Sequence, residues 1–507
     1  MALINWLASV LYTDRYKQMD RMATEGAAIQ AEQLRHILAR GSATMLGRER
    51  GLRPDMSYEE FSKAVSVTDY DGFRPYVERM MAGEKNVTWP GRVKWFAKSS
   101  GTSGSKSKFI PVTDEGLHDC HLKGTNDAVA TYMRQNPKTR IWKGKCLTLG
   151  GSKQLTDTGA GSQTGDLSAI MIGNAPMWTE LFKTPSKKVA LLSEWEEKLE
   201  KIATATMGQN VTSMAGVPSW MLVLLKYIME RRGVSTIADV WPDMELFIHG
   251  GISFAPYREQ YKRLCPGGMH FMETYNASEG FFGIQTDPAE KSMELMLDYG
   301  TFYEFIPLGE VGKAKPEGIV PLSGVKTGED YAMAITSVNG LWRYVIGDTV
   351  RFTGKDPYRF VISGRTKLYI NAFGEELMIS NAEAAMSEAC RETGAVVREY
   401  TAAPVFMDAE TRGCHEWMVE FDTPPADAEE FSEKLDKALQ RVNSDYEAKR
   451  YKDITLGRLR LNVAPQGLFE EWMRSHDKMG GQNKMPRLRN DRTLMDELKD
   501  MAARMAR

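Results

Sequence analysis

Residues 99–111 read SSGTSGSKSKFIP, and the interpretation of the rest of the chain depends on this stretch. Seven small hydroxyl or glycine residues, Ser99 to Ser105, come before Lys106 and Lys108. Small side chains leave backbone N–H groups accessible, hydroxyls add further donors, and lysine neutralises negative charge. A loop of this composition can wrap a polyphosphate, so the stretch predicts an ATP-binding loop.

The loop differs from the common P-loop. The pattern G-x-x-x-x-G-K-[ST] requires a second glycine at the position of Lys106. The apolar segments 93–97 and 108–112 on either side read as strands, and Pro111 excludes an immediate helix interior. We therefore expect strand, loop and strand, with a helix beginning near Asp114. A flexible Ser/Gly linker is the alternative, but linkers rarely lie between two apolar strands.

Composition excludes several classes of protein. The chain has 507 residues and a net charge of −2, from 65 basic and 67 acidic side chains. A nucleic-acid-binding surface normally shows a basic excess, so we expect no nucleic-acid partner. The five scattered cysteines lack metal-ligand spacing and fit a reducing, cytoplasmic location. No window is apolar enough to span a membrane, and we expect an amphipathic helix rather than a signal peptide at the N-terminus.

The order of predicted elements separates two domains, 1–363 and 364–507. In the first, apolar strands at 246–248 and 269–272 run directly into the polar turns 249–251 and 274–280. Ligands of open α/β sheets bind at the carboxyl ends of strands, so the two turns suit one shared site. Residues 300–362 alternate as antiparallel strands, and residues 415–421 of the second domain alternate as a half-buried strand. We expect the ATP and acyl-acid sites in the first domain.

Further segments carry residues suited to nucleotide chemistry. In YNASEG, residues 275–280, an aromatic ring that can stack on adenine precedes Glu279, a carboxylate that can hold Mg²⁺ against phosphate oxygens. In WRYVIGD, residues 342–348, Asp348 follows a strand and can accept the ribose hydroxyls. SGRTK at 363–367, NAFGEE at 371–376 and QNKMPR at 482–487 complete the series. Each segment alone is weak evidence, because a Gly-Asp turn is usually a plain turn and a lone lysine such as Lys484 is nearly always solvated. Only their order, together with the loop, makes the pattern specific.

In this order, SSGTSGSKSK, YNASEG, YVIGD and GRTK with NAFGEE resemble the motif series of adenylate-forming enzymes, which include acyl-CoA synthetases, luciferase and nonribosomal adenylation domains. FIP directly after the loop, LWRY before Gly347-Asp348, and QNKMPR resemble more closely a bacterial member of the GH3 family of acyl acid–amido synthetases. The resemblance spans about residues 90–490. The stretch GRTK to NAFGEE departs from the plant GH3 version, so plant substrate pockets are not implied.

The resemblance implies an α/β fold. A large N-terminal adenylation domain would combine mixed sheets with a β-barrel-like part, and a small mobile α+β domain would follow it. The implied reaction is ATP-dependent, Mg²⁺-assisted adenylation of a small carboxylic acid to an acyl-AMP. An amino acid or another amine would then take the acyl group and form an amide.

The resemblance also implies roles for individual residues. Lys484 would reach the α-phosphate or the carboxylate, Glu279 would hold Mg²⁺, and Lys108 or Lys106 would neutralise the β- and γ-phosphates. Lys367 would be the hinge between the two steps. The implied nucleotide-binding residues are Ser99, Ser100, Gly101, Thr102, Ser103, Lys106, Gly250, Gly251, Thr274, Tyr275, Asn276, Ala277, Ser278, Tyr344, Asp348 and Arg365. Within this set Tyr275 would lie along the adenine, Asp348 would bind the ribose, and Arg365 would add a ribose contact.

The acyl pocket is implied beside the helix that follows the loop and at the start of a helix near residue 217. Its implied residues are Leu117, His121, Val217 and Trp220. Such walls fit an apolar, aromatic acid, although plain core packing of this helix face is the alternative. No residue stands out as a base for the amine. Two other functions remain open: an acyl-CoA ligase that uses the same adenylate, and a nucleotide-binding protein without turnover.

Overall fold

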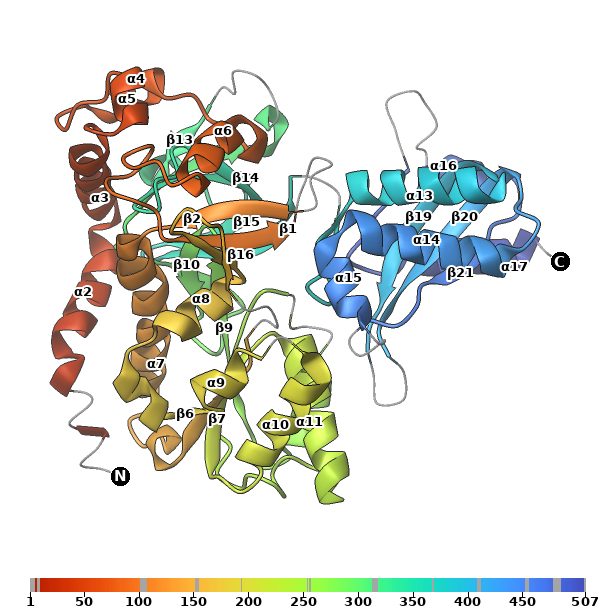
Figure 1. Ribbon diagram of the computed structural model, residues 1–507, viewed down its shortest axis with the longest axis horizontal. Coiled ribbons are helices and arrows are strands. Elements are labelled where there is room, and N and C mark those ends of the chain that lie inside the picture. The colour runs from red at the N-terminus through yellow and green to blue at the C-terminus, as the bar shows by residue number, and fades with distance from the viewer. Residues whose placement is uncertain are drawn as a thin grey trace. The chain divides into compact units, whose positions relative to one another are not determined.

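The structure is a computed structural model, and it describes residues 5–6, 10–100, 107–150, 155–192, 194–252, 254, 257–311, 318–366, 369–407, 412–451, 456–476 and 485–505. Contacts divide the chain into two compact units (Figure 1). Unit 1 comprises Met1–Ser99, Phe109–Gly251 and Tyr261–Thr366, and unit 2 comprises Ser100–Lys108, Ile252–Gln260 and Lys367–Arg507. Each unit is described by itself.

Helices open unit 1. They are α2 (Thr13–Thr24), α3 (Gly26–Gly41), α4 (Met45–Glu49), α5 (Tyr58–Ala64) and α6 (Tyr70–Met81). Side chains at their first residues fix several starts: Ser57 and Glu60 form a reciprocal capping box on α5, and Asp69 accepts from two backbone N–H groups of α6. These caps satisfy backbone donors that have no partner inside a helix.

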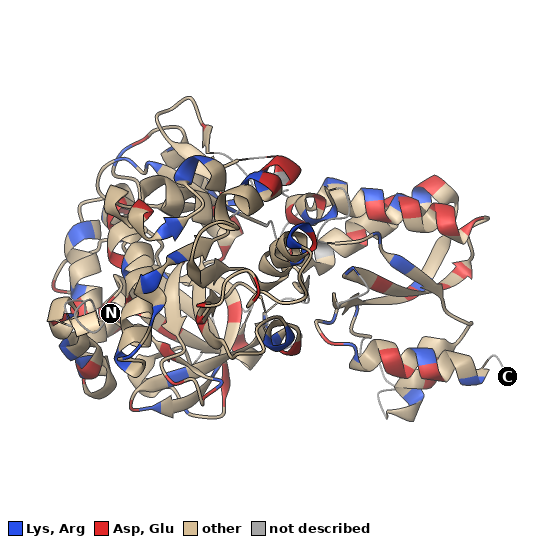
Figure 2. Cartoon of the chain, turned by 90° about the horizontal axis from the view of Figure 1, so that it is seen from below, with Lys and Arg blue, Asp and Glu red and all other residues tan. Residues whose placement is uncertain are grey.

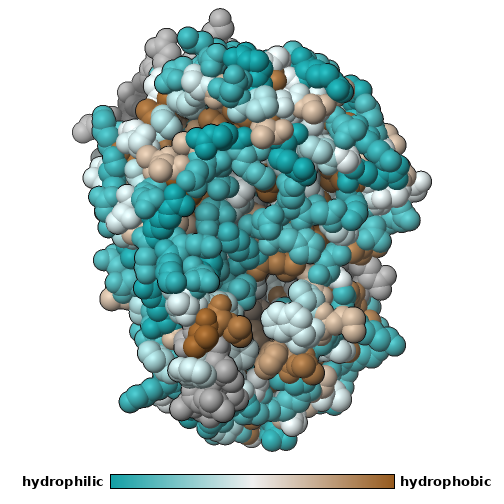
Figure 3. All heavy atoms as spheres, turned by 90° about the vertical axis from the view of Figure 1, so that its left-hand side faces the viewer, coloured by the Kyte–Doolittle hydropathy of each residue, from teal (hydrophilic) through white to brown (hydrophobic). Residues whose placement is uncertain are grey.

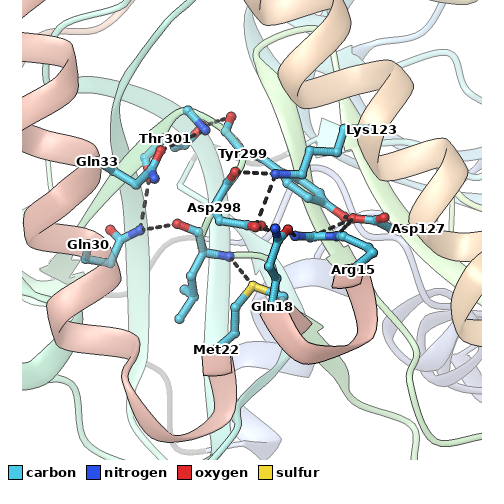
Figure 4. A network of polar contacts seen from close by, with 12 residues as sticks. Arg15, Gln18, Met22, Gln30, Gln33, Lys123, Asp127, Asp298, Tyr299 and Thr301 are labelled. Carbon is cyan, nitrogen blue, oxygen red and sulfur yellow. Dashed lines mark hydrogen bonds and ion pairs between the residues drawn. The ribbon is translucent and has the colours of Figure 1, made fainter. Parts of the chain in front are cut away.

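A buried polar network anchors α2 to the body of unit 1 (Figure 4). Arg15 of α2 pairs with Asp127 of α7 (Lys123–Gln135) at 2.7 Å and also bonds both carboxylate oxygens of Asp298. Lys123 Nζ lies 3.1 Å from Asp298, and the Tyr299 hydroxyl donates to Asp127 at 2.7 Å. We call these five residues the Arg15 network. Because it joins elements far apart in sequence, it fixes α2 against α7.

A twelve-stranded mixed sheet forms the centre of unit 1. Its order is β13-β12-β14-β15-β16-β11-β10-β9-β8-β7-β3-β6. Neighbours from β6 to β9 are parallel, whereas those from β9 to β13 are antiparallel. The bounds are β3 (Lys145–Thr148), β6 (Lys183–Thr184), β7 (Val211–Gly216), β8 (Leu246–His249), β9 (His270–Ala277), β10 (Gly280–Ile284), β11 (Met293–Leu295), β12 (Thr301–Pro307), β13 (Val320–Pro321), β14 (Asp330–Ser337), β15 (Tyr344–Lys355) and β16 (Tyr358–Arg365).

The expected antiparallel strands over 300–362 are confirmed by β12 to β16. The expected β-barrel-like part is wrong for the described strands, because β13 and β6 end the sheet on its two sides and do not pair with each other. A barrel would need these two ends to close. The sheet is therefore open, and its parallel half has free carboxyl ends at which ligands can bind.

A smaller sheet holds the two strands around the loop. Its order is β2 (Ser107–Val112), β1 (Trp95–Ser100), β5 (Gln163–Gly165) and β4 (Thr156–Asp157). The two strands expected around the loop are thus confirmed, residues 101–106 between them lie outside the described residues, and helical residues begin at Asp114. The first turns form a π-helix, η1 (Gly116–Leu122), before α7 begins. Wider π-helical turns are often found at functional sites.

Shorter helices connect the strands of unit 1. They are η2 (Ile141–Lys143), α8 (Leu167–Asn174), η3 (Met177–Leu181), α9 (Lys187–Ala190), α10 (Trp195–Thr206), α11 (Pro218–Arg232), α12 (Arg258–Leu264), η4 (Leu308–Glu310) and η5 (Leu322–Gly324). Pro218 occupies the first turn of α11 and Gly233 ends it with a left-handed φ of 66°. Both residues stand where their backbone preferences are met.

Unit 2 contains a three-stranded sheet in the order β19-β20-β21 and a two-stranded one. The strands are β17 (Tyr369–Ile370), β18 (Leu377–Met378), β19 (Val396–Val405), β20 (Cys414–Thr423) and β21 (Arg460–Val463). The helices are α13 (Ile379–Thr393), α14 (Ala428–Val442), α15 (Ser444–Arg450), α16 (Leu468–Ser475) and α17 (Thr493–Met505).

The expected half-buried strand at 415–421 is wrong in its burial, since every residue from 414 to 421 of β20 is buried. Trp417 packs in a cluster with α13 and α14, and Met418 packs in another with α16 and α17. The polar positions are satisfied by ion pairs: Glu416 bonds Arg492 at 2.6 Å and Lys499 at 2.9 Å. Burial opposes ionisation of Glu416, but these partners outweigh it and lower its pKa to about 2.

The surface carries mixed charge. Figure 2 shows Lys and Arg interspersed with Asp and Glu on both units, as the net charge of −2 predicts. The face with the N-terminal helices is mainly hydrophilic, with small hydrophobic groups near its lower edge (Figure 3). Among the described residues, no helix has the length and apolar character that crossing a membrane requires.

Candidate functional site

The carboxyl ends of β7, β8 and β9 bring two predicted regions together. A Cβ on Gly250, just after β8, would lie 2.3 Å from the carbonyl oxygen of Thr274 in β9. Gly251 has a φ of 84° and lies against Val217, which follows β7. Only glycine permits this close approach and this backbone conformation. We call this edge of the sheet, with the turns that follow the three strands, the carboxyl edge.

Three predicted nucleotide-binding residues meet in one cluster. Arg365 of β16 and Asp348 of β15 are cross-strand neighbours, and Arg365 Nε donates to Asp348 Oδ1 at 2.5 Å. The Tyr275 hydroxyl of β9 donates to the other carboxylate oxygen. Burial, and then the Asp348 carboxylate, raises the pKa of Tyr275 well above its ordinary value, so the hydroxyl stays a donor. The carboxylate of Asp348 is therefore held in one orientation from two sides.

The Tyr275 ring itself belongs to the core. It lies edge-on to Phe282 at 5.0 Å and tilted against Phe360 at 6.2 Å, and the residue is 6% exposed. Little of the ring is left for an adenine to stack on. The expected contact with adenine stays a prediction, and the contact that the structure does show is the bond to Asp348.

Glu279 is buried at the turn between β9 and β10, and Asn339 connects this turn to the strand that leaves the loop. Asn339 Oδ1 accepts from the backbone N–H of Thr113 at 3.1 Å, and its Nδ2 donates to the carbonyl oxygen of Glu279 at 3.3 Å. Gly116 makes room for it, because a Cβ there would lie 1.7 Å from Asn339 Oδ1. Sequence reasoning missed Asn339; its only signal was the Asn339-Gly340 pair typical of a hairpin turn.

Two tyrosines lie beside this connection. Tyr344 of β15 is 1% exposed, and its hydroxyl has no hydrogen-bond partner among the described residues. Burial, and then the charge of Glu279, raises the pKa of Tyr344 well above its ordinary value. Tyr70 of α6 accepts from the backbone N–H of Phe109 at 2.9 Å, directly after the loop. Tyr70 carried no motif and was not found from the sequence.

His121 of η1 lies at the carboxyl edge. Its Nδ1 is 2.8 Å from Oδ1 of Asn276, near the end of β9, and the residue is fully buried. Burial lowers the pKa of His121 to about 4, although the bond to Asn276 partly opposes the shift. Among the other residues implied for the acyl pocket, Leu117 is fully buried and Trp220 is 9% exposed. Val217, Asn276 and His121 thus lie at the same edge of the sheet.

The remaining predicted residues fall into two groups. Gly101, Thr102, Ser103, Lys106, Lys367 and Lys484 lie outside the described residues. Ser99 and Ser100 end β1, Lys108 is buried in β2, and Ala277 and Ser278 lie between Asn276 and Glu279. No group of three or more His, Cys, Asp or Glu side chains among the described residues forms a ready metal site.

Comparison with known families agrees with this geometry. The GH3 family N-terminal domain matches residues 15–172 and 152–269, the GH3 family central domain matches 294–365, and the GH3 family C-terminal domain matches 380–493. The chain belongs to the GH3 family. The resemblance drawn from the motifs is thereby confirmed. It follows that the clusters around Asp348 and Glu279 are parts of a GH3 protein.

Curated relatives of this GH3 protein match it over most of its length. The indole-3-acetic acid-amido synthetase GH3.3 of Arabidopsis thaliana is 25% identical, over 88% of this chain and 86% of the relative. The 4-substituted benzoates-glutamate ligase GH3.12 of the same plant is 23% identical, over 93% of this chain and 94% of the relative.

Solved structures share the fold. The GH3.15 acyl acid amido synthetase in complex with 2,4-DB has a TM-score of 0.62 at 19% identity, covering 96% of this chain and 95% of that one. A 2-hydroxyisobutyryl-CoA ligase in its thioester-forming state has a TM-score of 0.54 at 13% identity, covering 94% and 92%. The α/β architecture expected from the sequence is therefore confirmed, with the open sheet as its one correction.

Proposed function

We propose that this GH3 protein is an acyl acid amido synthetase. It adenylates a small carboxylic acid with ATP and passes the acyl group to an amine, most simply an amino acid. The observation that carries the proposal is the Asp348 carboxylate, which Tyr275 and Arg365 hold in place. All three residues belong to the motif series found in the sequence. The curated relatives, whose names are amido synthetases and an amino-acid ligase, support it.

The chemistry needs positioning more than a protein nucleophile. A free carboxylate acylates poorly because its leaving group would be oxide, whereas an acyl-AMP releases AMP. The acid's own oxygen attacks the α-phosphate, and pyrophosphate departs. Enzymes assist such steps by orienting the reactants and by placing donors where negative charge develops.

Asp348 is well suited to the ribose of ATP. A carboxylate offers about four lone-pair positions, and Tyr275 and Arg365 each occupy one. The remaining positions can accept both ribose hydroxyls. Because Tyr275 and Arg365 fix the carboxylate, little side-chain entropy is lost when the ribose binds.

Glu279 fits a magnesium ion that arrives with the nucleotide. Mg²⁺ is commonly held by one or two carboxylates together with substrate phosphates and water, so a single buried carboxylate suffices. When bound, the ion would neutralise phosphate charge. Asn339 fixes the backbone of Glu279 to the strand that leaves the loop, and so sets the distance between that carboxylate and the loop.

The remaining assignments are part of the same proposal. Loop residues 99–108 would hold the phosphates, with Lys106 or Lys108 as the cation, and Lys484 would reach the α-phosphate or the carboxylate. Lys367 would be the hinge of a mobile C-terminal domain, residues 364–507. Leu117, His121, Val217 and Trp220 would enclose an apolar, aromatic acid. The free state of all five cysteines supports a cytoplasmic location.

One experiment tests the proposal against its rivals. The protein is incubated with ATP, Mg²⁺ and a panel of carboxylic acids, and acid-dependent exchange of pyrophosphate into ATP is measured. Amino acids or coenzyme A are then added and AMP release is followed. We expect exchange with at least one acid and AMP release that requires an amino acid. A requirement for coenzyme A would instead identify a thioester-forming ligase, and no exchange would leave a nucleotide-binding protein.

A further inference from the structure

The ring of His121 is buried in unit 1. His121 is 0% exposed, and its Nε2 has no hydrogen-bond partner among the described residues. Its other nitrogen, Nδ1, lies 2.8 Å from Oδ1 of Asn276. Buried polar atoms are nearly always paired, so an exception marks a point at which an atom from outside the chain can bind. The π-helical turn that carries His121 is of a kind often found at functional sites.

The partner of Nδ1 determines the chemistry of Nε2. The Asn276 oxygen can only accept, and the amide nitrogen of Asn276 faces the sulfur of Met171 at 3.6 Å. Nδ1 must therefore carry the proton and donate it to Asn276. A neutral imidazole has one N–H, so Nε2 carries a lone pair and is an acceptor. The lowered pKa of about 4 keeps the ring neutral at physiological pH.

The position of His121 connects it to the reaction. Asn276 lies in YNASEG, three residues before Glu279 and next to Tyr275, which bonds Asp348. The same edge of the sheet carries Val217 and the Gly250-Gly251 turn. Ligands of open α/β sheets bind in the crevice at this edge. The ring of His121, held by Asn276 of the nucleotide motif, therefore lies at the edge of the sheet where the proposed function places the acid and the nucleotide.

We propose that His121 Nε2 recognises a hydrogen-bond donor, a hydroxyl or an N–H, on the body of the acyl acid and so selects which acids are adenylated. The inference rests on the proposed function and names the substrate class more closely. The acid is one whose apolar body carries a single donor. His121 contacts the substrate through Nε2, and Asn276 is the positioning residue that fixes the tautomer.

Two other partners for Nε2 fit less well. The reacting carboxylate of the acid is an acceptor when ionised, and two acceptors repel each other. The amine of the second step must lose a proton, and a ring whose pKa is lowered to about 4 is a weak base for that. A hydroxyl or N–H on the acyl body needs only a fixed acceptor. A site built to bond such a donor also rejects analogues that lack it.

The test uses acids in matched pairs that differ by one donor. Suitable pairs are phenylacetic and 4-hydroxyphenylacetic acid, benzoic and 4-hydroxybenzoic acid, and 1-methylindole-3-acetic and indole-3-acetic acid. Acid-dependent pyrophosphate exchange gives kcat/KM for each acid with the full-length protein. The variants are His121→Leu, which removes the acceptor, and His121→Gln, which keeps an acceptor at a similar reach. His118→Leu is the matched control, because His118 is exposed one turn earlier on the same helix.

We expect the wild type to prefer the donor member of at least one pair by about tenfold in kcat/KM. His121→Leu should lose that preference while still adenylating the acid without the donor. His121→Gln should restore part of the preference, and His118→Leu should match the wild type. Melting curves of each variant separate loss of recognition from loss of folding.

Three results would overturn the inference. They are a wild type with no preference in any pair, a preference that survives in His121→Leu, and a change confined to the KM of the amine. The failure of the proposed function would look different, because the wild type and every variant would then show no pyrophosphate exchange with any acid. If His121→Leu does not fold, the comparison of His121→Gln with the wild type decides the question: a preference reduced below that of the wild type would support recognition through Nε2, and an unchanged preference would overturn it.

Discussion

Two polar clusters of unit 1 differ in how completely their hydrogen bonds are made. In the Arg15 network, the guanidinium bonds both carboxylates, and Lys123 and Tyr299 supply further donors (Figure 4). None of its side chains has an unpartnered buried atom among the described residues. Around YNASEG, by contrast, the Tyr344 hydroxyl and the His121 Nε2 are buried without such a partner.

The difference separates holding the fold from binding a ligand. A closed network of ion pairs leaves nothing for a ligand to satisfy, and breaking it leaves a charge buried without its partner. An incomplete set of donors and acceptors costs stability, and it persists where a ligand completes it. Variants of the first cluster should therefore change stability, and variants of the second should change activity.

The largest effect should follow from Arg15→Met, which keeps the length of the side chain but removes its charge. Asp127, whose side chain is 1% exposed, would keep its charge and lose its cation. Removing one partner of a buried ion pair costs about 3–5 kcal/mol in unfolding free energy. Urea unfolding measures the loss, and kcat/KM for ATP at low temperature should stay at the wild-type value. Arg21→Met on the same helix is the control, since its pairs with Glu25 and Glu32 are exposed and screened by solvent, and so contribute little to stability. Equal losses in the two variants would contradict the closed-network interpretation.

The next effect should come from Asp348→Asn, which keeps the shape of the side chain and removes the charge that Arg365 faces. We expect acid-dependent pyrophosphate exchange to fall about 100-fold in kcat/KM for ATP, as for the loss of a fixed polar contact in an active site. Asp330→Asn is a matched control, because Asp330 and Arg351 form the same cross-strand pair on β14 and β15. If both variants retained wild-type exchange, Asp348 would be structural only.

The sequence predicted the frame of this site because its signals are local. Small residues between two apolar strands predicted β1 and β2, and a polar turn directly after an apolar strand predicted the end of β8. The turn expected at 274–280 was partly wrong, because β9 continues as a strand to Ala277. Tyr275, Asp348 and Arg365 were chosen from separate motifs, and they meet because β9, β15 and β16 belong to one sheet. In each case the deciding pattern lies within a few residues.

The contacts that complete the site depend on residues far apart in sequence. Asn339 bonds Thr113 across 226 positions and Glu279 across 60, and neither bond leaves a local pattern. Tyr70 meets Phe109 in the same way. The burial of both faces of β20 was missed for a related reason, since alternation records side-chain polarity and cannot show that Glu416 is paired inside. Ion pairs made by distant partners overrode the pattern.

The third prediction concerns how the stability of the protein depends on pH through the buried ring of His121. The pKa of His121 is lowered from 6.5 to about 4 in the folded state, so the unfolded chain binds the proton more strongly. Stability is therefore present above pH 6.5 and is lost as pH falls toward 4. Between pH 7.5 and 5 this shift corresponds to about 2 kcal/mol. We expect wild type and His121→Leu to differ in the slope of unfolding free energy over this range, with the variant flatter. Asn276, which the ring contacts, does not titrate, and burial raises the pKa of the neighbouring Cys120 to about 12, well above this range. Parallel slopes would show that the pKa of His121 is not lowered in the folded protein.

The smallest effect should separate a positioning role from a structural one. Asn339→Ala removes both bonds that connect Thr113 to Glu279. The strand that leaves the loop and the turn that carries Glu279 would then no longer be held at a fixed position relative to each other. We therefore expect kcat/KM for ATP to fall about tenfold. Because the proposed acyl pocket includes neither Thr113 nor Glu279, we expect the KM for the acid to stay unchanged. Asn174→Ala is the control, since Asn174 bonds the carbonyl of Ile170 within its own helix, α8. A general loosening of the fold would raise both KM values together, whereas a change confined to ATP would assign Asn339 to the alignment of the loop with Glu279.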